Sequence, residues 1–234
     1  MDVPHPSHRY LSLPDWAHGA KSSEDMTGLD LTSPLGLASP QQALLDVLKV
    51  AAPTERAAPG LREVRQQASA SFGLSADLTY VGCGISQLFR IICQSTLKEG
   101  DRVGLSEPTP DWVKRNILAV GAAYIDIGRD WSMRPLQGTF NRLLEDGNLS
   151  MVFSQSLCGQ TGTTGLEIPD GCDDLLVVHD HTHNPSPQVT DRGLHLIDLS
   201  IREGALGLPI CLALGDQERI ELLWRLEPEP QIAL

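Results

Sequence analysis

The residues best suited to chemistry lie in one short stretch, residues 175–183, which has the sequence L-L-V-V-H-D-H-T-H. Four apolar residues precede His179 and Asp180, a pattern typical of a buried parallel strand that ends at the aspartate. Open α/β sheets bind their ligands in a crevice beside the carboxyl ends of such strands. We therefore expect Asp180 at a crevice, either as a general acid or base or as a structural cap of a neighbouring backbone amide.

His183 follows Asp180 by three residues, so the two side chains could face the same crevice. A carboxylate that orients an imidazole forms an acid–base pair that works near neutral pH. A second hypothesis is a metal site, because His179, His181 and His183 alternate and would share one face of an extended strand. A strand that ends at Asp180 would scatter these imidazoles, and no distant further ligand is identifiable, so we expect no metal.

A glycine-rich turn, G-C-G-I-S at residues 82–86, separates a strand pattern from a helix pattern. Free N–H groups at a helix start attract anions, so Gly84, Ile85 and Ser86 are candidates for contact with an anionic ligand. The same environment would lower the pKa of Cys83 and make it a nucleophile. The alternative interpretation is that Cys83 is a small, half-buried thiol with a packing role only. A tight turn without any ligand is the other interpretation of the glycines.

Alternating strand and helix patterns must position these residues. Residues 78–105 contain a strand, the glycine-rich turn, a helix, a Gly-Asp turn and a strand, which predicts a βαβ unit. Further helices are predicted after Ser39-Pro40, over 61–72, over 113–120 and up to residue 224, and further strands over 122–127, 151–153 and 194–199. We expect a three-layer α/β sandwich with a mostly parallel sheet over residues 29–234, preceded by an irregular arm over 1–28.

Composition narrows the class of protein. The chain has 234 residues, 41% of them apolar, and 18 basic against 30 acidic residues give a formal charge of -12. This charge disfavours nucleic acid and anionic membranes as partners, because both require clustered Lys and Arg. No leader pattern or apolar stretch of spanning length occurs, so we expect a cytoplasmic protein. Five cysteines without CxxC spacing favour reduced thiols over disulfides or structural zinc.

The order of these elements resembles the large domain of the fold-type I pyridoxal-phosphate (PLP) aminotransferases, histidinol-phosphate aminotransferase in particular. The resemblance runs from about residue 28 to the C-terminus and is closest over the βαβ unit and Glu107-Pro108-Thr109. Asp180 then matches an acid that ends one strand of the family, and Ser200 matches a serine that precedes the Schiff-base lysine. Ile201 occupies the lysine position and cannot form a Schiff base.

Other family contacts to the cofactor are absent under the same resemblance. Gly159 stands at the position of an asparagine, His183 at that of a tyrosine and Pro209 at that of an arginine. Pro110 replaces a stacking aromatic, although Trp112 lies two residues further on. We therefore expect no bound cofactor, and we expect the chain to lack the family's C-terminal small domain. The resemblance makes seven residues candidates for substrate contact: Gly84, Ile85, Ser86, Trp112, Gly159, Gln160 and Ser200.

Two functions from different classes fit these observations. The first is a PLP-independent enzyme of small-molecule biosynthesis, such as that of specialised metabolites, in which Asp180, His183 and Cys83 catalyse a cyclisation, isomerisation, dehydration or hydrolysis. The second is a non-catalytic homologue that binds a ligand or a pathway protein partner. A PLP-dependent aminotransferase rebuilt around another lysine, such as Lys114, is a third hypothesis. We also expect a homodimer, because the resembling domain completes its crevice with a partner and a shortened chain leaves apolar surface to cover.

Overall fold

The computed structural model describes residues 62–169, 172, 174–202 and 209–226. The predicted arm over residues 1–28 and the predicted helix after Pro40 lie outside the described residues. Within the described part, every helix is too short or too polar to cross a membrane.

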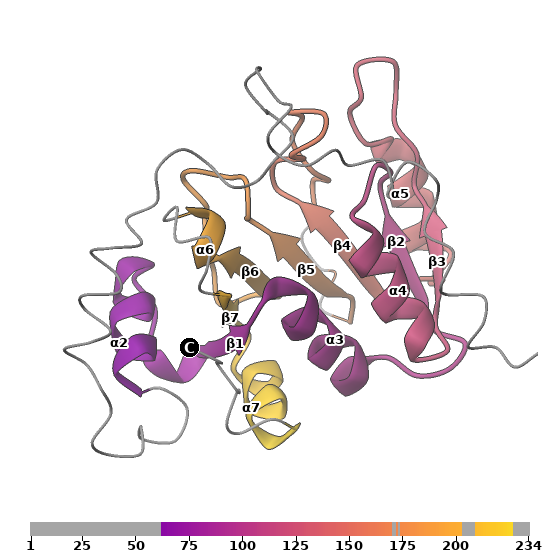
Figure 1. The fold of residues 1–234 in the computed structure, drawn as a ribbon. Helices are drawn as coiled ribbons and strands as arrows, with labels where there is room; N and C mark the ends of the chain where they lie inside the picture. Colours follow the sequence, from indigo (N-terminus) through magenta and orange to yellow (C-terminus); the bar gives the residue numbers. More distant parts are fainter. Residues whose placement is uncertain (1–61, 170–171, 173, 203–208, 227–234) are drawn as a thin grey trace, which may run out of the picture. The chain divides into compact units, whose positions relative to one another are not determined.

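One mixed sheet of seven strands organises the structure, in the order β1-β7-β6-β5-β4-β2-β3 (Figure 1). All strands except β7 run in the same direction, because β7 is antiparallel to both of its neighbours. The predicted α/β fold with a mostly parallel sheet is therefore confirmed. The strands are β1 (Thr79–Cys83), β2 (Arg102–Leu105), β3 (Ala123–Asp126), β4 (Met151–Gln155), β5 (Leu176–Asp180), β6 (Leu194–Asp198) and β7 (Ile210–Gly215).

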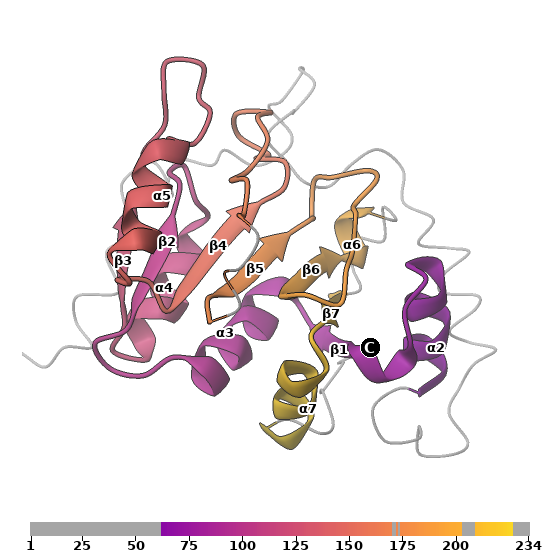
Figure 2. The same cartoon turned by 180° about the vertical axis from the view of Figure 1, so that it is seen from behind.

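Helices cover both faces of this sheet and complete three layers. Helices α3, α4 and α7 lie on the face that Figure 1 shows in front, and α5 lies on the opposite face beside β2 and β3 (Figure 2). The helices are α2 (Arg62–Ser71), the 3-10 helix η4 (Ala76–Leu78), α3 (Ile85–Thr96), α4 (Asp111–Ala119), α5 (Gln137–Glu145), α6 (Leu199–Arg202) and α7 (Gln217–Leu226).

Side chains of the central strands alternate between two hydrophobic cores. Leu176 and Val178 of β5 belong to the main core under α3, whereas Val177 packs with Phe140 of α5 on the second face. Successive side chains of a strand point to opposite faces. Asp180 therefore lies on the face of the main core, and the preceding His179 lies on the second face.

The structure confirms the predicted order of the βαβ unit and corrects the end of one predicted strand. The strands of the predicted βαβ unit are parallel but not adjacent, since β1 is an edge strand and four strands separate it from β2. The predicted strand over 194–199 ends one residue early, at Asp198, because its Oδ1 accepts hydrogen bonds from the N–H groups of Ser200 and Ile201 and so begins α6. The helix α5 and the strand β7 were not predicted.

Candidate functional site

Two carboxylates end neighbouring parallel strands at the carboxyl edge of the sheet. Asp180 ends β5 and Asp198 ends β6, and both side chains are buried. The Oδ1 atom of Asp180 accepts hydrogen bonds from the N–H of Thr182, at 2.9 Å, and from its hydroxyl, at 2.6 Å. The predicted position of Asp180 at a strand end is confirmed.

Burial raises the pKa of the Asp180 carboxyl above its ordinary value, because a buried carboxylate loses its hydration. The hydrogen bonds from Thr182 and the charge of His183 act in the opposite direction, whereas the charge of Asp198 adds to the rise. The carboxyl group therefore keeps its proton to a higher pH than a solvated aspartate does. In this state it can donate a proton, which is the role of a general acid.

His183 is exposed at the same edge and lies against Gly159. A Cβ atom placed on Gly159 would lie 2.5 Å from both Cδ2 and Nε2 of His183. With the ring in this position, a side chain at position 159 would clash with it. His183 interacts with Asp180 through charge, and the hydrogen bonds of the Asp180 carboxylate go to Thr182. That Asp180 orients this imidazole as part of an acid–base pair stays a prediction.

A different set of histidines gathers on the second face. The ring centroids of His179 and His195 lie 5.0 Å apart, and those of His181 and His195 lie 5.2 Å apart, with nearly parallel ring planes. His195 joins the group because it pairs with His179 in the register of β5 and β6. Among the described residues, no three His, Cys, Asp or Glu side chains are arranged to hold a metal ion.

Hydrogen bonds connect these imidazoles in a chain. Ser156 Oγ lies 2.9 Å from His181 Nδ1, His181 Nε2 lies 2.9 Å from His195 Nδ1, and His195 Nε2 lies 3.1 Å from the carbonyl oxygen of Arg192. Burial, with help from neighbouring positive charge, lowers the pKa of His181 to about 4 and that of His195 to about 3. Burial also lowers the pKa of His179. The three rings are therefore neutral near pH 7.

The glycine-rich turn places Cys83 at the end of β1 and Gly84 at the start of α3. Gly84 has a φ of 81°, which favours glycine, and no side chain caps the first turn of the helix. The N–H of Gly84 donates to the carbonyl oxygen of Pro209 at 2.6 Å, so this group of the turn is engaged within the chain. Ile85 packs against the main core, and Ser86 accepts a hydrogen bond from the Asn116 side chain, so both have structural contacts as well. Contact of these residues with a ligand stays a prediction.

Trp112 packs into the rim of the main core. Its ring lies edge-to-face with Phe89 at 5.6 Å and with Phe153 at 5.8 Å between centroids. These contacts give Trp112 a structural role in joining α4 to α3 and β4. Its predicted contact with a substrate stays a prediction.

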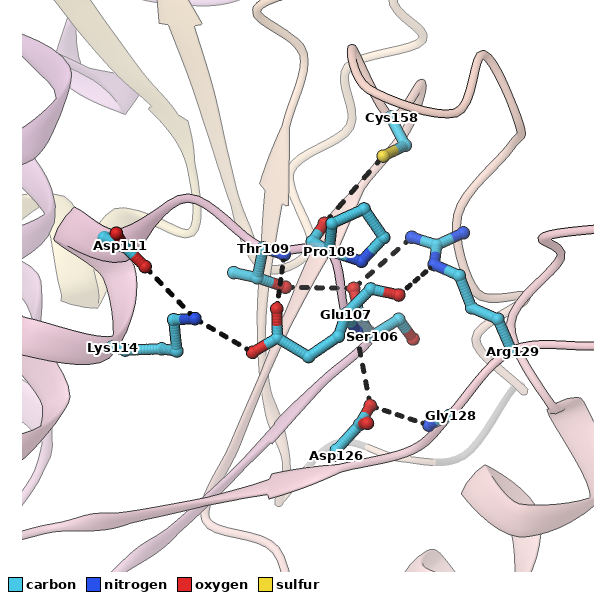
Figure 3. A network of polar contacts seen from close by, with 10 residues as sticks. All are labelled: Ser106, Glu107, Pro108, Thr109, Asp111, Lys114, Asp126, Gly128, Arg129 and Cys158. Atoms are coloured by element: carbon cyan, nitrogen blue, oxygen red, sulfur yellow. Dashed lines mark hydrogen bonds and ion pairs between the residues drawn. The ribbon is translucent and has the colours of Figure 1, made fainter. Parts of the chain in front are cut away.

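The loop after β2 is held by a polar network (Figure 3). Arg129 Nε donates to the carbonyl oxygen of Glu107 at 2.6 Å, and the carboxylate of Glu107 accepts from the N–H of Thr109 at 2.8 Å. Lys114 forms ion pairs of 3.2 Å with both Glu107 and Asp111, which raise the pKa of its amine. A protonated amine is not a nucleophile, so this lysine is poorly suited to form a Schiff base.

Cys158 is a candidate that the sequence analysis missed. Burial acts to raise its pKa, but a hydrogen bond from the Thr161 side chain, those from the N–H groups of Gln160 and Thr161, and the charge of Arg129 outweigh burial and lower it. Such a thiol has more thiolate character than an ordinary cysteine. Its place before Gly159 in a turn rich in Gly and Thr is the sequence signal that points to it. All five cysteines of the chain are free, as predicted.

The remaining candidates lie around Asp198. Both the N–H and the hydroxyl of Ser200 donate to Asp198 Oδ1, so this serine is engaged in starting α6. Ile201 follows on the same short helix with 40% of its surface exposed.

Comparison with solved structures identifies the fold. The chain is similar to N-succinyldiaminopimelate aminotransferase from Mycobacterium tuberculosis, with a TM-score of 0.70 and 16% identity over 82% of this chain and 59% of that one. It is also similar to a putative histidinol-phosphate aminotransferase from Erwinia carotovora atroseptica, with a TM-score of 0.69 and 12% identity over 84% of this chain and 63% of that one. For a Pyrococcus protein, A1, the TM-score is 0.74 and the identity is 17%, over 91% of this chain and 62% of that one.

These likenesses establish the fold, which is that of the large domain of fold-type I aminotransferases. The chain spans less than two thirds of the length of each of these structures. No protein-family model matches the sequence. No curated protein matches it either.

Proposed function

We propose that the chain is a PLP-independent enzyme that performs acid–base chemistry on a small molecule at the carboxyl edge of its sheet. The observation that carries this proposal is the buried Asp180 carboxyl, whose pKa is raised by burial and which stands where α/β folds present ligand-binding residues. An environment that shifts a pKa in this direction keeps a carboxylic acid ready to donate a proton.

The residues at the positions of PLP contacts do not fit that cofactor. Under the correspondence with the aminotransferases, Ile201 stands at the Schiff-base position and has no amine. The ring of His183 fills the space that an asparagine side chain at position 159 would need. Lys114, which could have replaced the missing amine, is held in two ion pairs. Together these contacts argue for chemistry by the protein's own side chains.

The proposed roles follow from the surroundings of each group. Thr182 holds Oδ1 of Asp180, while in the described part of the chain Oδ2 accepts no hydrogen bond and is left to a substrate. Asp180 gives its proton to a basic atom of the substrate, and His183 removes a proton elsewhere on the same molecule. Such a transfer suffices for an isomerisation, a dehydration or a cyclisation, and none of these needs a resident cofactor.

Mutagenesis with a metabolite readout tests this proposal. The purified protein is incubated with a pool of small metabolites, and mass spectrometry records which compound it converts. Asp180→Asn and His183→Ala should each remove most of that conversion, and the double variant should be little worse than either single one. Glu145→Gln, at the exposed end of α5, removes a carboxylate away from the site; it is the matched control and should retain conversion.

The same variants distinguish a non-catalytic binding subunit. Such a protein would convert nothing, and Asp180→Asn and His183→Ala would both leave its association with a pathway partner intact. Full conversion by both variants would also contradict the proposal, because neither group would then take part in proton transfer.

Added PLP gives an independent test. The protein should show no bound absorbance in the visible range and no adduct after borohydride reduction, because the Schiff-base position holds an isoleucine. A stable yellow protein with a reduced PLP adduct on any lysine would overturn the cofactor-free proposal.

We also propose that the protein acts as a homodimer, since the domain it resembles completes its crevice with residues of a second subunit. Light scattering at micromolar concentration should give twice the mass of the chain, and a monomer mass would contradict this.

A further inference from the structure

A cavity lies on the second face of the sheet, opposite the face of β5 that carries Asp180. It has a volume of about 480 Å³ and runs along β5 from Leu175 to His179, reaching the start of β6 at Gly193 and the start of α7 at Arg219. This volume lies within the range of about 300–1,000 Å³ that small-molecule sites occupy. The cavity shares no lining residue with the carboxyl-edge site.

Four charged residues of both signs are among those that line this cavity: Asp191, Arg192, Asp216 and Arg219. Across the described residues, none of the four takes part in an ion pair. Within the described ranges, the hydrogen bond that engages a side chain of the set is that of Asp216 Oδ1 with the N–H of Arg219, at 2.9 Å, which caps α7. Two positive and two negative groups therefore face a common space without neutralising one another.

The remaining wall of the cavity is apolar apart from one imidazole. Ile168, Leu175 and Val177 supply aliphatic surface, and Val177 is buried in the second-face core. His179 also lines the cavity, and its ring nitrogens make no hydrogen bond within the described structure. A half-buried imidazole whose nitrogens accept and donate no hydrogen bond in the described structure is an open position for a polar group of a ligand.

We propose that this cavity binds a small zwitterion with an apolar body, of the size of an apolar α-amino acid. Arg192 and Arg219 bind the carboxylate, Asp191 and Asp216 bind the ammonium group, and the aliphatic wall contacts the apolar part. An anionic ligand would pair with the two arginines and leave the two aspartates unpaired at the rim, and a cationic ligand would leave the two arginines unpaired. The balance of charges therefore favours a molecule that carries both a positive and a negative charge.

Calorimetric titration with three matched compounds tests the ligand class. L-phenylalanine should bind, whereas 3-phenylpropanoate, which lacks the ammonium group, and 2-phenylethylamine, which lacks the carboxylate, should each bind at least about tenfold more weakly. The proposal is wrong if the three compounds bind equally well or if phenylalanine gives no binding at millimolar concentration.

Variants of the full chain test the location. Arg192→Gln and Arg219→Gln should each weaken phenylalanine binding at least about tenfold, because each removes a charge-assisted contact. Arg225→Gln is the control on the same helix as Arg219, where Arg225 pairs with Glu221, and it should bind like the wild type. Thermal melts of all three variants show that the folded state is retained.

Asp180→Asn should leave phenylalanine affinity unchanged, because Asp180 lies on the other face of the sheet. Loss of binding in Asp180→Asn with full binding in both arginine variants would place the ligand at the carboxyl edge and overturn the proposal. The proposed acid–base function can fail in its own assay without affecting any of these outcomes.

Discussion

The two faces of β5 and β6 carry buried ionisable groups of opposite kinds. Asp180 and Asp198 lie on the face of the main core, whereas His179 and His195 lie on the second face with His181. Burial penalises the charged form in both regions, so it raises the pKa of Asp180 and lowers the pKa values of the histidines. One physical cause thus leaves a proton donor on one face and neutral proton acceptors on the other.

Acid should destabilise the protein through the histidine face, and this is the largest effect we expect. An unfolded histidine binds a proton below its ordinary pKa of 6.5, whereas His181 and His195 in the folded chain bind one only at about pH 4 and about pH 3. Unfolding therefore becomes more favourable as the pH falls from 6.5 to about 4, by up to about 1.4 kcal/mol per pH unit for each histidine. Urea unfolding measured across this range gives the slope.

His195→Gln removes one of these groups and keeps a polar side chain in its place. Its free energy of unfolding should fall with decreasing pH less steeply than that of the wild type, by up to about 1.4 kcal/mol per pH unit, between pH 6.5 and about 4. Equal slopes would mean that these histidines titrate normally and that the contrast between the two faces is absent.

Glycines beside the two regions should tolerate alanine very differently. Gly215 has a φ of 128°, and a Cβ atom there would clash with the carbonyl oxygen of Gly193, so Gly215→Ala should cost about 3 kcal/mol or more. At Gly159 the obstacle is the exposed ring of His183, which can rotate away, so Gly159→Ala should cost under about 1 kcal/mol. Denaturant unfolding compares the two, and equal costs would contradict this difference in rigidity.

Asp180→Asn should have the smallest effect on stability at pH 7. The raised pKa of Asp180 means that its ionised form opposes folding, and asparagine removes this penalty while it still accepts hydrogen bonds from Thr182. We expect an unchanged or slightly higher free energy of unfolding. As the pH falls through the folded pKa of Asp180 the wild type loses its penalty, so the difference should then shrink. A loss of about 1–3 kcal/mol at pH 7 would identify Asp180 as a structural cap instead.

Local sequence patterns predicted the elements that carry the carboxyl-edge site. The apolar run before Asp180 and the glycines around Cys83 mark strand ends by themselves, since their signal needs no distant partner. Helix α5 was missed because no side chain caps its start and Gly138 lies in its first turn. Strand β7 was missed because a short apolar run does not separate a strand from a buried helix.

Contacts between distant segments could not be predicted from such patterns. His195 joins His179 only through the pairing of β5 with β6, and Arg129, which follows β3, adds its charge to the local hydrogen bonds that lower the pKa of Cys158. The cavity on the second face of the sheet likewise combines segments around residues 168, 192 and 219. The order and register of the strands result from packing of the whole sheet, so local patterns in a single sequence do not predict them.

The most direct test of the account is the pKa of the Asp180 carboxyl in the folded protein. The ¹³C chemical shift of this group, assigned by its absence in Asp180→Asn, is followed by NMR as the pH is varied. We predict a midpoint above the ordinary value of 3.8, because burial favours the protonated form. A midpoint at or below 3.8 would show that the carboxylate is stabilised in its charged form, and Asp180 would then not be the proton donor of this site.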